Sequence, residues 1–445
     1  MVKSSSWGPR FGLKFLTGYG LILAISWLGG AFFFQEIDVL GHWKLMVAWS
    51  IVSAGTTLLI LDLMGFFDLI RYVPQKRNMI TLGLAAPLGA VIAKYLLFSV
   101  RGIPVARYRE IIWVAPLVAI IAYGYHYATW LSINRSKFKM RILAAITERE
   151  QARLERAIRE CGLPDFAIFR RLDGKELALS KDEPIDWIIY SRVTLRDLVK
   201  DLIIVKKIVL GSPAIEWRRF LIHLRRRVDL DLFDTWTFIQ YLDEGGFTSR
   251  FYGFMKVILE PVAALLIMAA FSPFFLLICC LIRIDSKGAP IFSQMRTGDG
   301  ERNFKLYKFR TMVEDAEEGG PSWSAHGDSR ITRFGTFLRK TRLDEMPQLW
   351  NVFKREMSFI GPRPERPEYY AKFETSIPLF SMRTAVKPGI TGWAQVHHGY
   401  AASVEESIIK LEYDLYYLLN QSLWMDMAIV FKTFSLFYRG GGTGR

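Results

Sequence analysis

Cysteine is scarce in this sequence, which has three cysteines among 445 residues: Cys161, Cys279 and Cys280. Two of them are adjacent within an apolar run, and the set offers neither a disulfide framework nor the ligand spacing of a zinc site. This scarcity fits a reducing compartment. The N-terminus is basic, but its apolar run is long and no small-residue cleavage site clearly follows it, so we expect no cleavable signal peptide.

Signatures of nucleic-acid and dinucleotide binding are also missing. The formal net charge is +15, yet the basic residues are spread along the chain, without a helix-turn-helix or an aromatic RNA-binding pattern. The first strand expected in the middle of the chain is followed by Ala145-Ile146-Thr147-Glu148-Arg149, which is not a G-x-G-x-x-G turn. We therefore expect no nucleic-acid partner, and no nucleotide cofactor in that part of the chain.

Apolar residues, in contrast, are abundant: 51% of the chain is hydrophobic and 14% is aromatic. High apolarity with a basic excess is typical of a membrane protein that faces anionic lipid or anionic substrates. Four apolar runs, at about 11–34, 43–67, 79–100 and 111–131, are each long enough to cross a hydrocarbon core of about 30 Å. Basic residues flank the runs so that the N-terminus and the chain after the fourth run are predicted to be cytoplasmic.

Residues 136–250 alternate between strand-like and helix-like patterns. Strands are expected at 140–146, 166–169, 187–190 and 228–233, with helices near 149–161, 195–208 and 216–227. This alternation predicts a small α/β, Rossmann-like domain with a largely parallel sheet. We assign it a structural or regulatory role.

The fifth apolar run, 251–284, is long enough to span a membrane, but it contains Ser272 and Pro273. Pro273 cannot donate a hydrogen bond to the carbonyl of Ala269, and the Ser272 hydroxyl can bond the Met268 carbonyl. We therefore predict a re-entrant helix–break–helix whose two ends lie on the cytoplasmic face. A fifth crossing would instead carry the rest of the chain to the opposite side, away from cytoplasmic substrates.

Two adjacent carboxylates, Asp344 and Glu345, follow a basic stretch that includes Arg339 and Arg342. The pattern predicts the start of a helix, with Asp344 as its N-cap and Pro347 in its first turn. A carboxylate at a positive helix end would stay ionised near neutral pH, as a nucleophile requires. Taken alone, such a pair is more commonly an ordinary helix cap on a basic surface.

Several motifs around this pair occur together and in a fixed order. They are Lys308-Phe309-Arg310-Thr311-Met312, Asp328-Ser329-Arg330-Ile331-Thr332-Arg333-Phe334-Gly335, Leu343-Asp344-Glu345-Met346-Pro347-Gln348, Ser358-Phe359-Ile360-Gly361-Pro362-Arg363-Pro364-Glu365 and Lys387-Pro388-Gly389-Ile390-Thr391-Gly392-Trp393-Ala394-Gln395-Val396. Over roughly residues 250–440 this set resembles the bacterial sugar transferases, or monotopic phosphoglycosyl transferases. The preceding spans and α/β domain make the chain similar to the large members, of the undecaprenyl-phosphate galactose or glucose phosphotransferase type.

The resemblance implies a reaction and a set of site residues. A UDP-hexose would donate its sugar-1-phosphate to undecaprenyl phosphate and release UMP, with Asp344 as the covalent nucleophile and Mg²⁺ as cofactor. Glu345 would bind the metal or orient Asp344. Guanidinium groups match phosphate oxygens, so the candidates for phosphate and nucleotide binding are Arg310, Arg339 and the rigid Pro362-Arg363-Pro364 triplet.

The expected architecture has four parts: transmembrane helices over 1–135, the α/β domain over 136–250, the re-entrant helix over 251–284 and the catalytic domain over 285–445. Residues 403–438 suit interfacial amphipathic helices, with a core helix pair as the alternative. The protein would lie in the bacterial inner membrane, in contact with lipid, and its aromatic-rich membrane helices would allow a homodimer. Two other functions remain open: a transporter or flippase of lipid-linked sugar, and a membrane-tethered phosphohydrolase.

Overall fold

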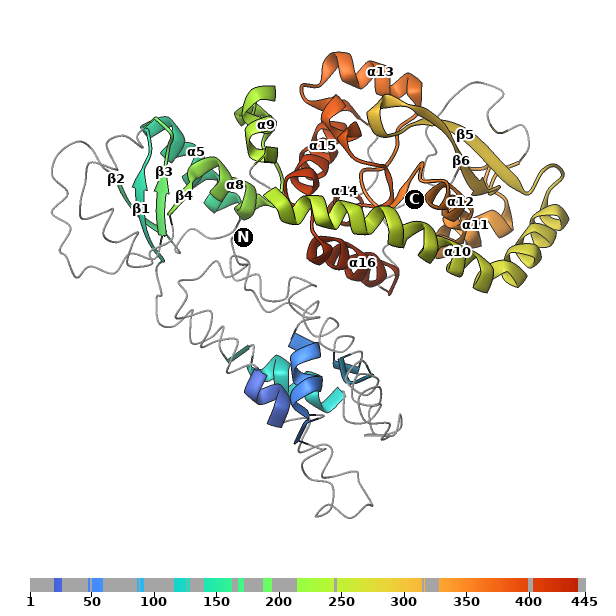
Figure 1. Cartoon of the computed structure of the whole chain (residues 1–445), viewed down its shortest axis with the longest axis horizontal. Helices are drawn as coiled ribbons and strands as arrows, with labels where there is room; N and C mark the ends of the chain where they lie inside the picture. The colour runs from blue at the N-terminus through green and yellow to red at the C-terminus, as the bar shows by residue number, and fades with distance from the viewer. Residues whose placement is uncertain are drawn as a thin grey trace. The chain divides into compact units, whose positions relative to one another are not determined.

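The chain divides into two compact units, Met1–Arg225 and Arg226–Arg445, which are described separately (Figure 1). The division falls within the region that the sequence assigned to one α/β domain, and the four-part division stays a prediction. The computed structural model describes residues 20–25, 47–48, 50–58, 86–87, 89–91, 116–125, 127–128, 140–161, 167–171, 187–193, 214–243, 246–313, 316, 328–398 and 403–438.

Most of the four predicted transmembrane runs lies outside the described residues. The parts that are described, such as 20–25, 50–58 and 116–125, are helical. The Thr56 hydroxyl donates to the Gly89 carbonyl at 2.7 Å, which joins the second and third runs. The four crossings themselves stay a prediction.

The first unit contains a parallel four-stranded sheet in the order β2-β1-β3-β4. Three strands lie where the sequence predicted them: β1 (Met140–Ala145), β2 (Ala167–Arg171) and β3 (Trp187–Tyr190). The fourth, β4 (Ala214–Glu216), was not predicted. The helices α5 (Glu148–Glu160) and α8 (Trp217–Arg225) correspond to two predicted helices.

The turn after β1 is closed by a capping box at the start of α5. The Thr147 amide donates to the Glu150 carboxylate at 2.8 Å, and the Ser191 hydroxyl donates to the other carboxylate oxygen at 2.8 Å. A carboxylate therefore lies at this helix N-terminus, the position where dinucleotide-binding domains bind a pyrophosphate.

One expected strand, 228–233, is wrong. It contains a 3₁₀ turn, η2 (Leu230–Leu232), and belongs to the second unit, in which the helix α9 (Thr235–Asp243) follows. The amide of Val228 donates to the carbonyl of Glu412, which lies in the helix α15 (Val404–Leu419). The alternating sequence pattern thus fits a partly buried turn as well as a strand.

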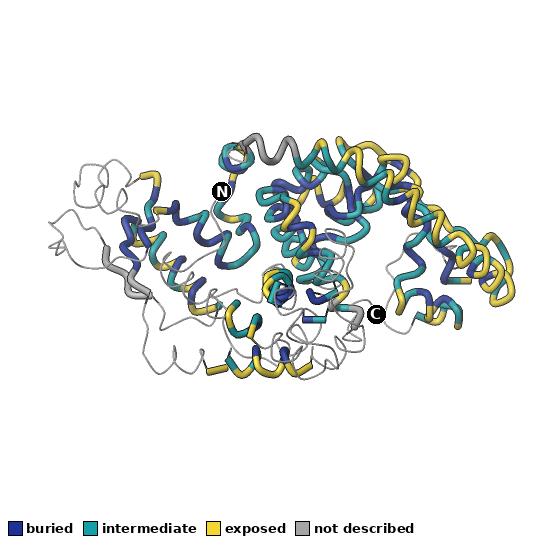
Figure 2. Tube along the Cα trace, turned by 60° about the horizontal axis from the view of Figure 1, so that its bottom comes forward, coloured by how far each residue is buried: buried dark blue, intermediate teal, exposed yellow. Residues whose placement is uncertain are grey.

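The longest helix, α10 (Gly246–Asp285), contains the fifth apolar run. Among the described residues it is the one helix that is long and apolar enough to cross a membrane, judged by length and composition. Only 11% of its most apolar stretch of 18 residues is buried, and Figure 2 shows exposed residues along the helix. A soluble surface rarely presents so much contiguous apolar area, so this surface suits contact with lipid.

Ser272 and Pro273 lie within α10, which stays helical through them and so differs from the predicted helix–break–helix. The Ser272 hydroxyl donates to the carbonyl of Ala269 at 2.8 Å, which corrects the predicted bond to Met268. Pro273 leaves the Ala269 oxygen without its usual amide donor, and the hydroxyl replaces that donor. In Figure 1 the helix changes direction in its C-terminal part, as helices commonly do at proline.

Residues on both sides of Pro273 pack against the same domain. Ala264 and Met268 belong to one apolar cluster, and Ile278 and Ile282 belong to a second. Met346, which lies two residues after Asp344, packs against both clusters. The whole of α10 is therefore anchored to the domain that carries the Asp-Glu pair.

The rest of the second unit begins with an antiparallel hairpin, β5 (Ile291–Thr297) and β6 (Asn303–Phe309), joined by η3 (Asp299–Glu301). The alternating sequence patterns at 290–292 and 304–310 predict strands at both places. Short elements follow: α11 (Arg333–Thr341), η4 (Leu343–Gln348), α12 (Leu349–Phe353), β7 (Ser358–Ile360), α13 (Pro367–Ser376), η5 (Phe380–Ala385), β8 (Gly389–Thr391) and α14 (Trp393–His397). Figure 1 shows the hairpin between α13 and α12.

The last two helices, α15 and α16 (Leu423–Tyr438), differ in burial. In α15 Leu411, Asp414 and Leu415 are buried, which matches the core-helix alternative. In α16 Trp424 and Phe434 are exposed, so an interfacial position on the membrane remains a prediction for this helix alone.

Candidate active site

The Asp-Glu pair lies in a tight turn between two helices. The helix α11 ends at Arg342, whose φ of 58° is left-handed, and the chain continues directly into the 3₁₀ turn η4. Arg342, rather than Asp344, is the N-cap residue of η4, and Asp344 lies in its first turn. This corrects the predicted cap and leaves the Asp344 carboxylate available for other contacts.

Three cations converge on Glu345. Its Oε1 lies 2.9 Å from Arg363, 3.3 Å from Lys308 and 3.9 Å from Arg342. Burial by itself would raise the pKa of Glu345, but these three cations outweigh burial and hold the pKa well below its usual value. Glu345 is therefore ionised at neutral pH.

Asp344 is buried to a similar degree, but its contacts differ. Its side chain is buried, and its Oδ1 has no hydrogen-bond partner among the described residues. Burial, followed by the adjacent charge of Glu345, raises the pKa of Asp344, while Lys308, Arg342 and Arg363 oppose the rise. The sequence predicted a carboxylate stabilised by a helix end, but desolvation reverses the expected direction. A desolvated carboxylate oxygen that lacks a hydrogen-bond donor is well suited to attack an electrophile.

Lys308 is a site residue that sequence reasoning missed. Burial lowers its pKa to about 8, against the opposing effect of Glu345. The residue belongs to β6, and this strand packs against the Asp-Glu turn. Lys308 stands two positions before Arg310 in the same motif, so strand alternation places both on one face. This alternation is the sequence pattern that could have identified Lys308 as a candidate site residue.

Of the three predicted arginines, Arg363 is the one whose described contacts include the carboxylate pair. Arg310 donates to the carbonyl and hydroxyl oxygens of Ser286 at 2.8 and 3.0 Å, just after the end of α10. Arg339 donates from Nε to the Thr311 hydroxyl at 2.8 Å. These contacts fix the surroundings of α10 and α11, and phosphate binding by either residue stays a prediction.

The Pro362-Arg363-Pro364 triplet follows β7 after Gly361, and β7 pairs in parallel with β8. Two glycines make this pair possible, because a Cβ built at Gly389 would lie 2.1 Å from the amide nitrogen of Gly361. The Gly389 amide donates to the Pro362 carbonyl at 2.9 Å. The backbones of the two motifs that contain Gly361 and Gly389 are thus in direct contact, and this contact fixes the start of the triplet.

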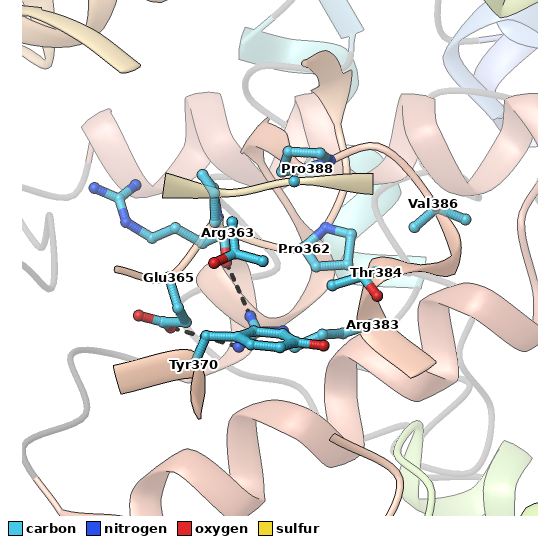
Figure 3. Close-up of a pocket in the computed structure, with 11 residues that line it drawn as sticks. Pro362, Arg363, Glu365, Tyr370, Arg383, Thr384, Val386 and Pro388 are labelled. Atoms are coloured by element: carbon cyan, nitrogen blue, oxygen red, sulfur yellow. Dashed lines mark hydrogen bonds and ion pairs between the residues drawn. The ribbon is translucent and has the colours of Figure 1, made fainter. Parts of the chain in front are cut away.

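A hollow of about 240 Å³, counting the open space at its mouth, lies beside the triplet. Figure 3 shows Tyr370 and Arg383 on one side of it, with Pro362 and Pro388 on the other. The main chain of Arg363 lines this hollow, and its guanidinium points away from it (Figure 3). The hollow and the Asp-Glu pair are therefore on opposite sides of the Arg363 main chain.

The carboxylate oxygens of Asp344 and Glu345 could provide some of the ligands of a Mg²⁺ ion. No cluster of three or more His, Cys, Asp and Glu side chains occurs among the described residues. Mg²⁺ commonly binds one or two carboxylates and completes its coordination with phosphate oxygens and water. The buried Oδ1 of Asp344, which lacks a partner among the described residues, is the oxygen that such an ion would satisfy.

The family match to known proteins lies in the second unit. The sequence profile described as bacterial sugar transferase matches residues 251–440. A UDP-N-acetylgalactosamine-undecaprenyl-phosphate N-acetylgalactosaminephosphotransferase from Aeromonas hydrophila is 45% identical over 194 residues, which are 44% of this chain and 46% of that protein. A UDP-glucose:undecaprenyl-phosphate glucose-1-phosphate transferase from Xanthomonas campestris pv. campestris is 36% identical over 196 residues, or 43% and 40% of the two chains.

A third relative is matched over most of its length. The exopolysaccharide production protein PSS from Rhizobium leguminosarum bv. phaseoli is 38% identical over 182 residues, which are 40% of this chain and 90% of that protein. The chain thus spans less than half of the first two relatives and nearly all of the third. The residues that match the family profile, 251–440, contain the Asp-Glu pair and its three cations.

Proposed function

We propose, because this chain belongs to the bacterial sugar transferase family, that it transfers a hexose-1-phosphate from a UDP-hexose to undecaprenyl phosphate and releases UMP. The relatives from Aeromonas hydrophila and Xanthomonas campestris have names that state this type of transfer. The product would be the first lipid-linked intermediate of an O-antigen, capsule or exopolysaccharide. Its active site would face the cytoplasm at the inner membrane.

The observation that carries the proposal is the asymmetry of the carboxylate pair. Glu345 is neutralised by Arg363, Lys308 and Arg342. Asp344 next to it is buried, and its Oδ1 has no partner among the described residues. One carboxylate therefore organises the cations, while the other is available to react.

The proposed chemistry has two displacements at one phosphorus atom. A carboxylate oxygen of Asp344 attacks the phosphorus that carries the hexose, and the bond from that phosphorus to the UMP oxygen breaks. The acyl phosphate on Asp344 then reacts with a phosphate oxygen of undecaprenyl phosphate. The carboxylate leaves with its bonding electron pair, and Asp344 is regenerated.

The surrounding cations would offset the negative charge that both substrates bring. Arg363 is the primary candidate, because a guanidinium can bind a phosphate while it still contacts Glu345. Lys308 and Arg342 keep Glu345 ionised and add positive potential next to Asp344. Asp344 and Glu345 would hold Mg²⁺, which supplies charge neutralisation at the diphosphate when it is bound.

The arrangement of α10 supports a re-entrant position in the membrane. Residues on both sides of Pro273 pack against the catalytic domain, through clusters that share Met346. A helix that crossed the membrane would carry its far end away from this domain. A re-entrant α10 would hold Asp344 near the headgroup plane, where a lipid phosphate lies.

Release of UMP from purified protein tests the proposal. The protein is incubated with Mg²⁺ and a panel of UDP-sugars that includes UDP-glucose and UDP-N-acetylgalactosamine, with and without undecaprenyl phosphate. Sustained UMP release that requires the lipid supports transfer. Equal release without the lipid would indicate a phosphohydrolase, and no release with any UDP-sugar would contradict the proposed function.

A further inference from the structure

Residues 360–365, the segment that carries Arg363, are held in place by hydrogen bonds that other residues donate to their main-chain carbonyls. Five of its carbonyl oxygens accept hydrogen bonds from other parts of the chain at 2.9–3.0 Å. The acceptor and donor pairs are Ile360 with Lys256 (3.0 Å), Pro362 with the Gly389 amide (2.9 Å), Arg363 with Arg383 (2.9 Å), Pro364 with Arg296 (3.0 Å) and Glu365 with the Thr297 amide (2.9 Å). We call residues 360–365 the Arg363 segment.

The helix α15 reaches this segment through a buried ion pair. Asp414 of α15 is 1% exposed, and its Oδ2 lies 2.9 Å from the guanidinium of Arg383. The same nitrogen of Arg383 donates to the carbonyl of Arg363 at 2.9 Å, and the other terminal nitrogen lies 3.5 Å from Glu365. Figure 3 shows the contacts of Arg383 with Arg363 and with Glu365.

The helix α16 reaches the segment through a second pair of the same kind. Asp426 is buried, and its Oδ2 lies 3.0 Å from the ammonium of Lys256 in α10. This ammonium donates to the carbonyl of Ile360 at 3.0 Å. The hydroxyl of Tyr417 lies 2.9 Å from Asp426 and 3.2 Å from the same carbonyl.

Both connections follow one pattern, in which a buried aspartate holds a cation and the cation binds a carbonyl of the Arg363 segment. Burying such a pair is costly, and either partner alone is strongly unfavourable. A simple requirement for packing would be met by apolar side chains at less cost. The pattern therefore points to a requirement for orientation.

We infer that Asp414 and Asp426 are positioning residues that fix Arg363 against Glu345, acting through Arg383 and Lys256. The inference rests on the proposed function, because it assigns the orientation of Arg363 a role in phosphosugar transfer. Neither aspartate contacts Asp344 or Glu345 in the described contacts; each acts through the main chain of the Arg363 segment. A displacement of about 1 Å at a reacting site can lower a rate by about a hundredfold.

A double-mutant cycle between Asp414 and Arg363 tests this inference. Asp414→Asn should lower lipid-dependent UMP release by about ten- to a hundredfold in the wild-type background. In the Arg363→Lys background the same change should lower the remaining rate by less than about threefold, because the group being positioned has been replaced. An equal fold-change in both backgrounds would show a general effect on the fold and would overturn the inference.

Glu412→Gln is the matched control. Glu412 lies on the same helix and pairs with Arg227 at 3.4 Å, away from the Arg363 segment. Its substitution should leave UMP release within about twofold of wild type. If Asp414→Asn fails to fold, Arg383→Lys replaces it in the cycle, because an ammonium keeps the charge beside Asp414 but lacks the guanidinium fork. The same cycle with Asp426→Asn tests the second pair.

Hydrogen exchange followed by mass spectrometry provides a readout that needs no activity. The amides of Gly389 and Thr297 donate to the Arg363 segment, so they report whether the segment stays in place. Exchange at these amides should be at least about tenfold faster in Asp414→Asn than in wild type or Glu412→Gln. Unchanged exchange would overturn the inference. If wild type releases no UMP with any UDP-sugar, the proposed function fails, and exchange alone then decides whether Asp414 holds the segment.

Discussion

Arg363 donates to the carboxylate of Glu345 across 2.9 Å, although 18 residues separate them in the sequence. This contact joins the 3₁₀ turn that carries Asp344 to the segment that follows β7. Lys308 and Arg342 complete the group of cations around the same oxygen. The result is one firmly ionised carboxylate next to one buried carboxylate whose Oδ1 lacks a partner among the described residues.

Arg363→Lys should lower UMP release by about a hundredfold, the effect typical of losing one preorganised donor at a reacting centre. A lysine keeps the positive charge but cannot bridge Glu345 and a phosphate with two nitrogens in one plane. Steady-state rates with saturating UDP-hexose measure the effect. Arg366→Lys, in the N-cap residue of α13, is the control and should stay near wild type. If Arg363→Lys has the wild-type rate, the assignment of Arg363 to the active site is contradicted.

Activity should fall as pH rises through about 8, because the pKa of Lys308 lies near that value. Deprotonation removes one of the three cations that neutralise Glu345. Lys308→Arg keeps its charge at all these pH values, so its activity should persist to about pH 9. A pH–rate profile of both proteins makes the comparison, and the same alkaline decline in Lys308→Arg would contradict the assignment.

A loss of folding would not explain that alkaline decline. The pKa of Lys308 in the folded protein is below its unfolded value of about 10.4, so the unfolded state binds more protons between pH 8 and 10.4. The contribution of Lys308 to the free energy of unfolding therefore rises with pH over that window. Melting temperatures are measured at pH 7.5 and pH 9 for both proteins. Between these pH values the wild-type melting temperature should not fall more than that of Lys308→Arg.

Gly389→Ala should destabilise the second unit by about 1–3 kcal/mol, or prevent its folding, because the new methyl group would lie 2.1 Å from the Gly361 nitrogen. Gly253→Ala is the control, since nothing lies within 4 Å of a Cβ at that position. Urea unfolding followed by fluorescence measures both variants. Equal midpoints for the two variants would mean that β7 and β8 do not approach as closely as described.

Single cysteines at Ser180 and Ser381 should be labelled only from the cytoplasm. Both positions lie on the same side of the membrane if α10 re-enters, because a re-entrant helix returns the chain to the face it left. The experiment uses intact cells and a protein whose three native cysteines have been replaced. Labelling of Ser381 from outside, with Ser180 protected, would show that α10 crosses the membrane.

The parts of the structure that the sequence predicted depend on local patterns. The apolar length of α10 and the alternation of β1, β3, β5 and β6 are visible residue by residue. The Asp344–Glu345 pair was found because its motif neighbours accompany it in a fixed order. The prediction of Val228–Phe233 as a strand was wrong, because alternation alone does not show whether a partner strand exists.

The features that the sequence did not predict depend on contacts between distant residues. Alternation groups Lys308 with Arg310, and only the structure shows that Lys308 contacts Glu345 while Arg310 contacts Ser286. Asp414 and Asp426 stand among aromatic residues typical of interfacial helices, and their partners Arg383 and Lys256 lie 31 and 170 residues earlier in the chain. Burial also reversed the expected direction of the Asp344 pKa.

The central claim is that Asp344 carries the phosphosugar, and intact-mass measurement of the protein tests it most directly. Wild type is incubated with UDP-hexose and Mg²⁺ in the absence of undecaprenyl phosphate, in parallel with Asp344→Asn. An amide cannot perform the attack, whereas the near-isosteric change should leave the fold intact. We predict a mass increase of one hexose phosphate on wild type, lost on addition of undecaprenyl phosphate, and no increase on Asp344→Asn. An adduct on folded Asp344→Asn, or transfer by wild type with strictly sequential kinetics and no adduct, would contradict the account.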